Sequence, residues 1–384
     1  MVEAGSTASL QTPVGAGERI TNLDAMRGIA VLGIVVMNAV SYGLPEAAYF
    51  NLSAAGSDNW LDWVIGVTGE IFIDQKTMAL FSMLFGAGIV LFADRAQAKG
   101  ANAGRLSLWR NFLLLLIGLV HSMLWEGDVL FVYALCAPLL IALRKRQPRT
   151  LLIAGTAVVL WSAVLAVIVQ TTIPADGDGL GDYWFTNGSA MSDAVGLFLL
   201  NDFFARAFGM MLIGVALYRL DVLQGTRPTA FYRSMVRWGL GIGVPIAAAG
   251  VAIQAIADFS PDIAIIGEAP NTLATIPIAL GYVGAITLWN QRPTTGLHER
   301  LRAAGRMALT NYLTQTILGV IILRGLLSAT DLTRTAIAVF IVGVWALQLA
   351  WSKPWLDRFR FGPFEWAWRC ATYRKMQPIR RAPT

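Results

Sequence analysis

Long apolar stretches separated by short polar loops predict an all-α, polytopic integral membrane protein. About 20 apolar residues form a helix that crosses the hydrocarbon core of a bilayer. Ten such stretches are found, at residues 23–43, 77–94, 108–125, 128–144, 150–172, 195–219, 235–257, 271–290, 307–326 and 334–352. We therefore expect one transmembrane domain over 23–352, preceded by a polar segment 1–22 without the apolar core of a cleaved signal peptide, and followed by a tail 353–384.

Basic residues are concentrated in alternate loops. The chain has 30 lysines and arginines, and 26 of them are predicted on one side of the membrane. This side holds loops 95–107, 221–234 and 291–305 and both termini. The four exceptions are Lys76, Arg206, Arg324 and Arg334. Loops 44–62, 174–193 and 258–270 are acidic. The positive-inside rule then predicts a multi-pass protein of a bacterial-type inner membrane with both termini in the cytoplasm. This topology explains the pI near 9.5 without a nucleic-acid partner.

Composition supports the same class. Hydrophobic residues make up 56% of the chain and charged residues 14%, whereas soluble domains carry roughly 25% charged residues. Cys136 lies in a predicted span and Cys370 in the tail, so no disulfide is expected. Two histidines far apart in the sequence make a metal site improbable.

His121 is the leading candidate for catalytic chemistry. It lies in the run NFLLLLIGLVHSMLW, which has no other ionisable side chain, and an ionisable group inside a membrane span is a functional-site hypothesis by default. Eleven residues separate it from Arg110, about 16 Å along a helix, so it is expected in the outer half. Asp128 follows at i+7, and Asn38 and Asp74 are expected at the same depth. These four residues form a predicted outer polar cluster.

A second cluster is predicted at the inner ends of the spans, with net positive charge. Its members are Asp24, Arg27, Arg110, Arg306, Asn311, Tyr312 and Gln315.

Each of these residues also has a structural interpretation. Asp24 and Arg27, at i, i+3 spacing, can be an ordinary pair at a helix start. Asn38 can bond two helices together, and so can a neutral His121. Asp128 can be the N-cap of the following helix. The other histidine, His298 in the loop TTGLHER, is expected at the surface.

Five blocks resemble a known family when taken in this order. They are RITNLDAMRGIAVLGIVVMNA (19–39), IFIDQKTMALFSMLFGAG (71–88), GLVHSMLWEGDVLFVYAL (118–135), GRMALTNYLTQT (305–316) and RFGPFEWAWRCATY (360–373). Together they resemble the YeiB-like family, domain of unknown function 418. That family is similar to the transmembrane acyltransferase superfamily of heparan-α-glucosaminide N-acetyltransferase, which moves acetyl groups from cytosolic acetyl-CoA across the membrane to an amino sugar.

The resemblance implies an acyltransferase that uses acetyl-CoA or another acyl-CoA. Asp24 and Arg27 match the LDxxRG motif, and Asn38 matches an active-site asparagine of the lysosomal enzyme. That enzyme's catalytic histidine has no counterpart here, because no histidine lies between Arg27 and Arg110. His121, in the family's own GxxH…GDxL block, is the replacement candidate.

The implied chemistry assigns a role to each cluster. Imidazole can act as the general base and an Asn38 amide as the donor to an oxyanion, while Asp128 or Asp74 orients the imidazole. The phosphates of CoA suit the basic inner cluster of Arg27, Arg110 and Arg306. The acceptor is a small molecule or a glycan at the outer face or in the membrane.

Two interpretations from other classes compete with this one. A transporter of a small metabolite uses buried polar groups as substrate or proton relays, but the sequence has no convincing internal repeat and no Gly- or Pro-broken pair of helices in matching halves. A nonenzymatic membrane scaffold leaves His121 unexplained. The sequence predicts no oligomeric state.

The tail alternates aromatic and charged side chains. They are Phe361, Phe364, Trp366 and Trp368 among Arg358, Arg360, Glu365 and Arg369. Such a pattern is typical of an interfacial anchor, and the family resemblance adds the expectation that the tail packs beneath the inner mouth of the domain.

Overall fold

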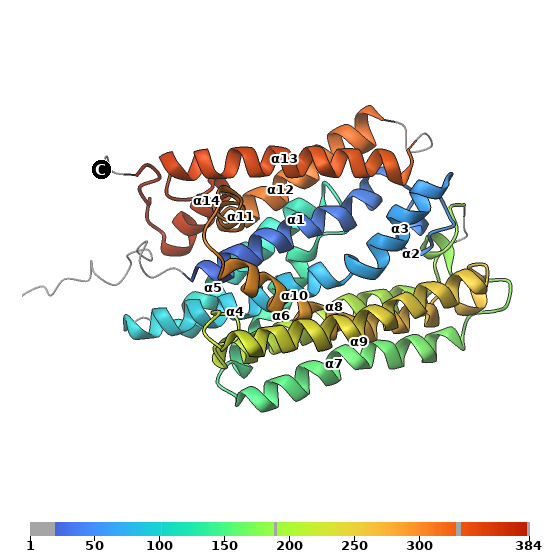
Figure 1. Cartoon of the computed structure of the whole chain (residues 1–384), viewed down its shortest axis with the longest axis horizontal. Helices are drawn as coiled ribbons and strands as arrows, with labels where there is room; N and C mark the ends of the chain where they lie inside the picture. Colours follow the sequence, from blue (N-terminus) through green and yellow to red (C-terminus); the bar gives the residue numbers. More distant parts are fainter. Residues whose placement is uncertain (1–19, 101, 188–189, 328–331, 382–384) are drawn as a thin grey trace, which may run out of the picture.

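The computed structural model describes residues 20–100, 102–187, 190–327 and 332–381. The predicted N-terminal segment therefore lies, up to residue 19, outside the described residues, as do residues 188–189 of the loop 174–193. The described chain is a bundle of helices that run side by side along its long axis (Figure 1). The elements are α1 (Thr21–Gly43), α2 (Ala47–Phe50), α3 (Trp60–Phe72), α4 (Lys76–Ala98), α5 (Ala103–Ser122), α6 (Val129–Leu143), α7 (Pro148–Gln170), η3 (Gly181–Tyr183), α8 (Asp193–Arg219), α9 (Thr229–Ile256), η4 (Pro261–Ile263), η5 (Ile266–Glu268), α10 (Ala269–Asn290), α11 (Gly296–Arg306), α12 (Ala308–Gly319), η6 (Val320–Leu326), α13 (Arg334–Arg358) and α14 (Pro363–Tyr373).

The all-α membrane fold predicted from the sequence is confirmed. Each of the ten predicted stretches coincides with a helix, and in the described ranges eight spans are long and apolar enough to cross a membrane. The other two are α6, with 15 residues, and α12, whose 12 residues continue into the π-helical η6. Helix α13 runs to Arg358, beyond the predicted end of the tenth span at residue 352.

The second span differs from the prediction. It begins at Trp60 and reaches Ala98, with a break between α3 and α4. At the break Gln75 has φ +60°, a left-handed conformation that is uncommon for a residue other than glycine. The hydropathy pattern missed α3 because Asp62 and Glu70 interrupt its apolar residues and Asp74 follows just after it.

The two ends of the bundle differ in charge. The basic end is where α1, α5, α7 and α9 begin and where α11 and α14 lie; the acidic end carries α2, η3 and η4 (Figure 1). The basic loops all fall at the first end and the acidic loops at the second. The basic and acidic loops that alternate along the sequence therefore lie at opposite ends of the folded bundle.

Two glycines let α1 and α11 cross in backbone contact at the basic end. A Cβ on Gly28 would collide with the Leu301 carbonyl, and one on Gly305 would collide with the Asp24 carbonyl. Arg27 precedes Gly28 and Arg306 follows Gly305, so the close crossing of the two helices brings the two arginines to the same depth in the bundle.

Opposite exposure of the two ends can be tested by chemical labelling. Single cysteines at Asp178, at the acidic end, and Arg300, at the basic end, should react with an impermeant maleimide from opposite sides of sealed vesicles, in a background that lacks Cys136 and Cys370. The positive-inside rule predicts that Arg300 is on the cytoplasmic side. Labelling of both positions from one side would contradict the arrangement of spans.

Candidate active site

A cavity of about 620 Å³ opens among α1, α4, α5, α12 and α14 toward the basic end. Among the described residues, six cationic side chains line it: Arg27, Arg95, Lys99, Arg110, Arg306 and Arg369. Deeper in the bundle the lining is mostly apolar and aromatic, with Phe85, Leu114 and Leu309. The cavity, which we call the basic cavity, ends at Leu130 and Tyr312. A strongly cationic mouth with an apolar interior suits a ligand with an anionic head and an uncharged arm.

Arg110 is held between two aromatic rings at this mouth. Its guanidinium lies 4.5 Å from the ring centre of Phe92 and 4.2 Å from that of Trp368, distances at which cation–π attraction operates. The Trp368 indole N–H donates to the Arg110 carbonyl oxygen at 3.0 Å. The tail helix α14 is therefore docked onto α5, and five of its residues line the basic cavity.

Glu365 fixes the other side of α14. Its carboxylate accepts from the Thr310 backbone N–H at 2.9 Å and from the Thr310 hydroxyl at 2.6 Å. Thr310 is in the first turn of α12, where backbone N–H groups lack helical partners, so Glu365 caps that helix from a distant segment. Burial raises the pKa of the Glu365 carboxyl, while its bonds to Thr310 act in the opposite direction.

His121, Asp128 and Tyr312 meet behind the inner end of the basic cavity, and we call them the histidine group. His121 Nδ1 lies 3.0 Å from Asp128 Oδ1, and both side chains are buried. The contact has the distance of an ion pair but not the alignment of a hydrogen bond, as is common for catalytic pairs without substrate. The Tyr312 hydroxyl donates to Asp128 Oδ1 at 2.8 Å, and the His121 and Tyr312 ring centres are 5.2 Å apart.

Asp128 carries out a structural task as well. Its carboxylate accepts from the backbone N–H groups of Leu130 at 3.1 Å and Phe131 at 3.4 Å, so it is the N-cap of α6. His121 Nε2, by contrast, is buried without a hydrogen-bond partner among the described residues. A buried polar atom without a partner is costly, and this nitrogen is where a general base would receive a proton.

Asn38 lies at the edge of the histidine group. Its side chain is close enough to the Tyr42 hydroxyl to interact with it, and Tyr42 packs edge-on against Trp125, one helical turn beyond His121, with ring centres 4.9 Å apart. Asn38 is therefore linked to the surroundings of His121 by way of Tyr42 and does not contact His121 itself.

Other expected members of the two clusters lie elsewhere. Asp74 accepts from the Tyr49 hydroxyl at 2.9 Å and the Asn271 amide at 2.9 Å, on the opposite side of α1 from the histidine group, so the predicted outer cluster of four is divided. The reason is the break after α3, which turns Asp74 toward α10.

Three residues of the predicted inner cluster do not line the basic cavity. Asn311 bonds to the Ala304 carbonyl oxygen at 3.1 Å and to Ser352, and Gln315 bonds to Gln348 at 2.9 Å, so both tie α12 to its neighbours. Asp24 forms an ion pair with Arg27 at 3.4 Å, the i, i+3 contact expected from the sequence. Arg27, Arg110, Arg306 and Tyr312 are the predicted cofactor-binding residues that do line the cavity.

The expectation that His298 is a surface residue is wrong. It is 2% exposed, stacks on Trp289 with ring centres 3.8 Å apart, and Nε2 lies 3.0 Å from the Trp289 carbonyl oxygen. Its Nδ1 forms the N-terminal capping box of α11 with Thr295. His298 is therefore a structural residue of the basic end.

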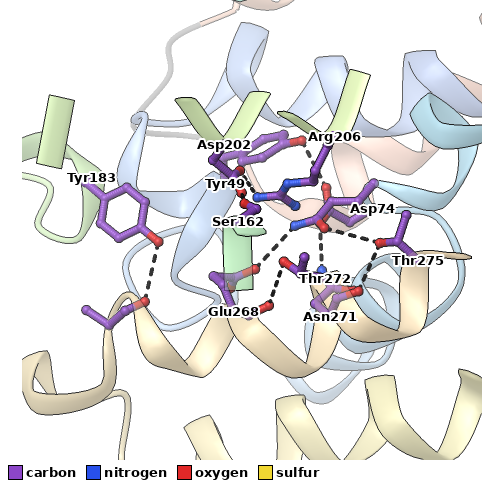
Figure 2. Close-up of polar contacts among 12 residues, drawn as sticks. Tyr49, Asp74, Ser162, Tyr183, Asp202, Arg206, Glu268, Asn271, Thr272 and Thr275 are labelled. Atoms are coloured by element: carbon purple, nitrogen blue, oxygen red, sulfur yellow. Dashed lines mark hydrogen bonds and ion pairs between the residues drawn. The ribbon is translucent and has the colours of Figure 1, made fainter. Parts of the chain in front are cut away.

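A second polar region, which sequence reasoning did not assemble, surrounds the break between α3 and α4 (Figure 2). We call it the acid–base network: Glu70, Asp74, Lys76, Asp202, Arg206, Glu268 and Arg334. Arg206 forms an ion pair with Asp202, one helical turn away on α8, and Ser162 also donates to Asp202. Fully buried Lys76 donates to Asn271 and to the Glu70 carbonyl oxygen.

One sequence signal would have found this network. Asp202 and Arg206 lie inside the predicted span 195–219 at i, i+4 spacing, and paired charges inside a span mark an interior polar site. Charge counting alone places Arg206 and Lys76 on the outer side, whereas both are buried in the bundle.

Comparison with known proteins places the chain among relatives that match nearly its whole length. The chain is 31% identical to the uncharacterized protein YeiB of Escherichia coli (strain K12) over 388 residues, which cover 94% of this chain and 98% of YeiB. It is also 31% identical to the uncharacterized protein YxaH of Bacillus subtilis (strain 168), over 97% of this chain and 98% of YxaH. The pattern of the protein family of unknown function DUF418 matches residues 217–375. The chain belongs to the DUF418 family. The matched DUF418 segment includes Arg306, Tyr312 and the whole of α14, whereas His121 and Asp128 lie outside it.

Proposed function

We propose that this DUF418 protein transfers an acyl group from a cytosolic acyl-CoA, with acetyl-CoA as the first candidate, to an acceptor that reaches the histidine group. The observation that carries the proposal is the basic cavity, which leads from six cationic side chains to Tyr312 and thus to the Asp128–His121 pair. The positive-inside rule supports placing the basic end, and with it the mouth of the cavity, in the cytoplasm.

The cavity fits the parts of an acyl-CoA in order. Phosphates match the arginines of the mouth, where bidentate guanidinium contacts are strong, and the rings around Arg110 offer a face for an adenine base. The uncharged pantetheine arm matches the apolar interior lined by Phe85, Leu114 and Leu309. Arg110 and His121 lie on one helix about 16 Å apart along its axis, a span that an extended arm covers.

The histidine group supplies the acid–base chemistry in this proposal. His121 Nε2 takes the proton of the acceptor amine or hydroxyl as that atom attacks the thioester carbonyl, and the thiolate that leaves takes a proton from the imidazolium. Asp128 orients the imidazole and stabilises its charged form. The Tyr312 ring stands between the cavity and the imidazole, so the acyl group reaches His121 when Tyr312 moves aside.

Purified protein with acetyl-CoA labelled in the acetyl group tests the proposal. Transfer of label to an added amine or sugar, or to the protein itself, with release of free CoA, supports acyl transfer. If vesicles that contain the protein instead take up a labelled solute unchanged and never release CoA, the chain is a transporter and the proposal fails.

Arg110→Gln should weaken CoA binding about 10- to 100-fold, since a lost charge-assisted hydrogen bond costs roughly 1.5–3 kcal/mol. The matched control is Arg300→Gln, because Arg300 is exposed at the same end and bonds to the Leu349 carbonyl oxygen without lining the cavity. Calorimetric titration with CoA at two salt concentrations measures both. Equal affinities in the two variants would show that the cavity mouth does not bind the phosphates.

A further inference from the structure

The acid–base network has an imbalance of charge. Among the described residues it contains four carboxylates, Glu70, Asp74, Asp202 and Glu268, and three cations, Lys76, Arg206 and Arg334. With every group ionised, one negative charge is left in the interior of the bundle, where an uncompensated charge is expensive. Uptake of one cation removes this cost.

Hydrogen bonds single out one of the four carboxylates. Both oxygens of Asp74 accept bonds, from Tyr49 and Asn271, and both oxygens of Asp202 accept bonds, from Ser162 and Arg206. The Glu268 oxygens accept from Gln254 at 3.0 Å and from Gln75 at 3.5 Å. The Glu70 carboxylate has no hydrogen-bond donor in the part of the chain that the structure describes. An ionised carboxylate is an acceptor only and is stabilised by donors. Glu70 is half-buried where the other three carboxylates are buried, and it is the member that the protein's own donors stabilise least.

A cavity lies beside the Glu70 side chain. It has a volume of about 60 Å³ and is lined by Tyr49, Glu70, Asp74 and Arg334 together with apolar residues of α1, α3 and α13. A water molecule needs roughly 10–15 Å³ of such volume and two or more polar partners, and both requirements are met. Tyr49 on α2 and Arg334 at the start of α13 belong to the acidic end of the bundle, so this is the side from which water has the shorter route.

A second observation is an unused hydrogen-bond donor deeper in the network. Arg206 is 6% exposed, and its Nε has no hydrogen-bond partner among the described residues, although the side chain lies among Asp74, Asp202 and Glu268 (Figure 2). A guanidinium N–H is a donor only, so this nitrogen can bond to a water oxygen but not to a cation. No group of three or more His, Cys, Asp or Glu side chains within the described ranges is arranged to hold a metal ion, which favours a proton over a metal.

We propose that Glu70 is a proton-binding site, which draws its proton through this cavity from the acidic end of the bundle. The proton adds to a carboxylate oxygen of Glu70 and lowers the net negative charge of the acid–base network and of Asp62, which also faces Arg334. The titratable and charged groups that face the site from the surrounding elements are Tyr49, Asp62, Asp74, Lys76, Tyr183, Asp202, Arg206, Glu268 and Arg334. The site lies on the other side of α1 from the basic cavity, and the inference does not depend on acyl transfer.

Infrared spectroscopy of the full-length protein in lipid tests this directly, through the carbonyl stretch of a protonated carboxylic acid. The measurement is made in Glu365→Gln protein, because burial raises the pKa of the Glu365 carboxyl and Glu365 would otherwise contribute a band of its own. We expect a protonated-carboxyl band near neutral pH that is lost when Glu70→Gln is added. Asp58→Asn, at an exposed residue of the acidic end, is the matched control and should keep the band.

An isotope measurement covers the case in which Glu70→Gln does not fold. Labelling every glutamate side-chain carboxyl with ¹³C should shift the band in the Glu365→Gln protein, whereas aspartates remain unlabelled. Four outcomes would overturn the assignment. The band could be absent, or it could fail to shift with the label. It could also survive Glu70→Gln, or disappear in Glu268→Gln instead.

Discussion

His121→Ala should lower the rate of acyl transfer by roughly 10²–10⁴, the usual cost of removing a general base, while CoA binding and insertion into the membrane stay nearly unchanged. The imidazole lies behind Tyr312 and does not line the basic cavity, so its loss leaves the CoA contacts in place. Its structural contribution is small, because an interhelical hydrogen bond in a membrane averages about 0.6 kcal/mol. Turnover of labelled acetyl-CoA and calorimetric CoA binding, measured on the same preparation, check both parts.

His121→Gln sharpens this test. Glutamine can bond to Asp128 but cannot accept a proton at neutral pH, so activity should stay low in a folded protein. His298→Gln is the matched control: it removes the other histidine, which stacks on Trp289 and does not line the cavity, and should affect stability rather than turnover. Near-normal turnover in His121→Gln would make His121 a structural residue, and the proposed mechanism would fail.

The fold was predictable because hydropathy and charge act over whole segments. Ten apolar stretches and alternating basic loops lead to the helices and to the two charged ends without any knowledge of packing. The break after α3 was not predictable in this way, since Glu70 and Asp74 lower the hydropathy of a segment that nevertheless crosses the bundle. Their charges are tolerated there because Lys76 lies beside them in the sequence and Arg206 and Arg334 come from other parts of the chain.

The candidate site was predictable where residues follow one another on a helix and less so where packing joins distant segments. His121 and Asp128 belong to consecutive helices, and Arg27 and Arg306 each adjoin a glycine of a recognisable block. Glu365, by contrast, caps α12 from 55 residues away, a contact that only the folded tail reveals. Asn311 and Gln315 share a helix with Tyr312 but face α13 and α1, because these two residues, at i, i+4 spacing, lie on one face of α12 and Tyr312 lies on another.

Asp128→Asn should separate the two tasks of Asp128. Asparagine is as good an N-cap as aspartate. Its single side-chain oxygen can keep the 3.1 Å bond from the Leu130 N–H, while the 3.4 Å bond from the Phe131 N–H is lost. The charge that stabilises the His121 imidazolium is lost, and in a serine protease the equivalent change lowers kcat by about 10⁴. We therefore expect Asp128→Asn to lose at least about 100-fold in turnover without a large change in thermal stability, on the general-base scale of roughly 10²–10⁴.

Asp128→Ala supplies the comparison that decides between the catalytic and the capping role. Alanine removes the charge, the N-cap of α6 and the acceptor of the Tyr312 hydroxyl together, so it should also lose stability, by about 1 kcal/mol for the cap alone. If Asp128 acts in catalysis, the two variants share a low turnover and differ in thermal unfolding. If Asp128 is only a helix cap, Asp128→Asn retains wild-type turnover, and the carboxylate–imidazole pair has no part in the chemistry. The paired measurement therefore separates the charge of Asp128 from its role as the N-cap of α6.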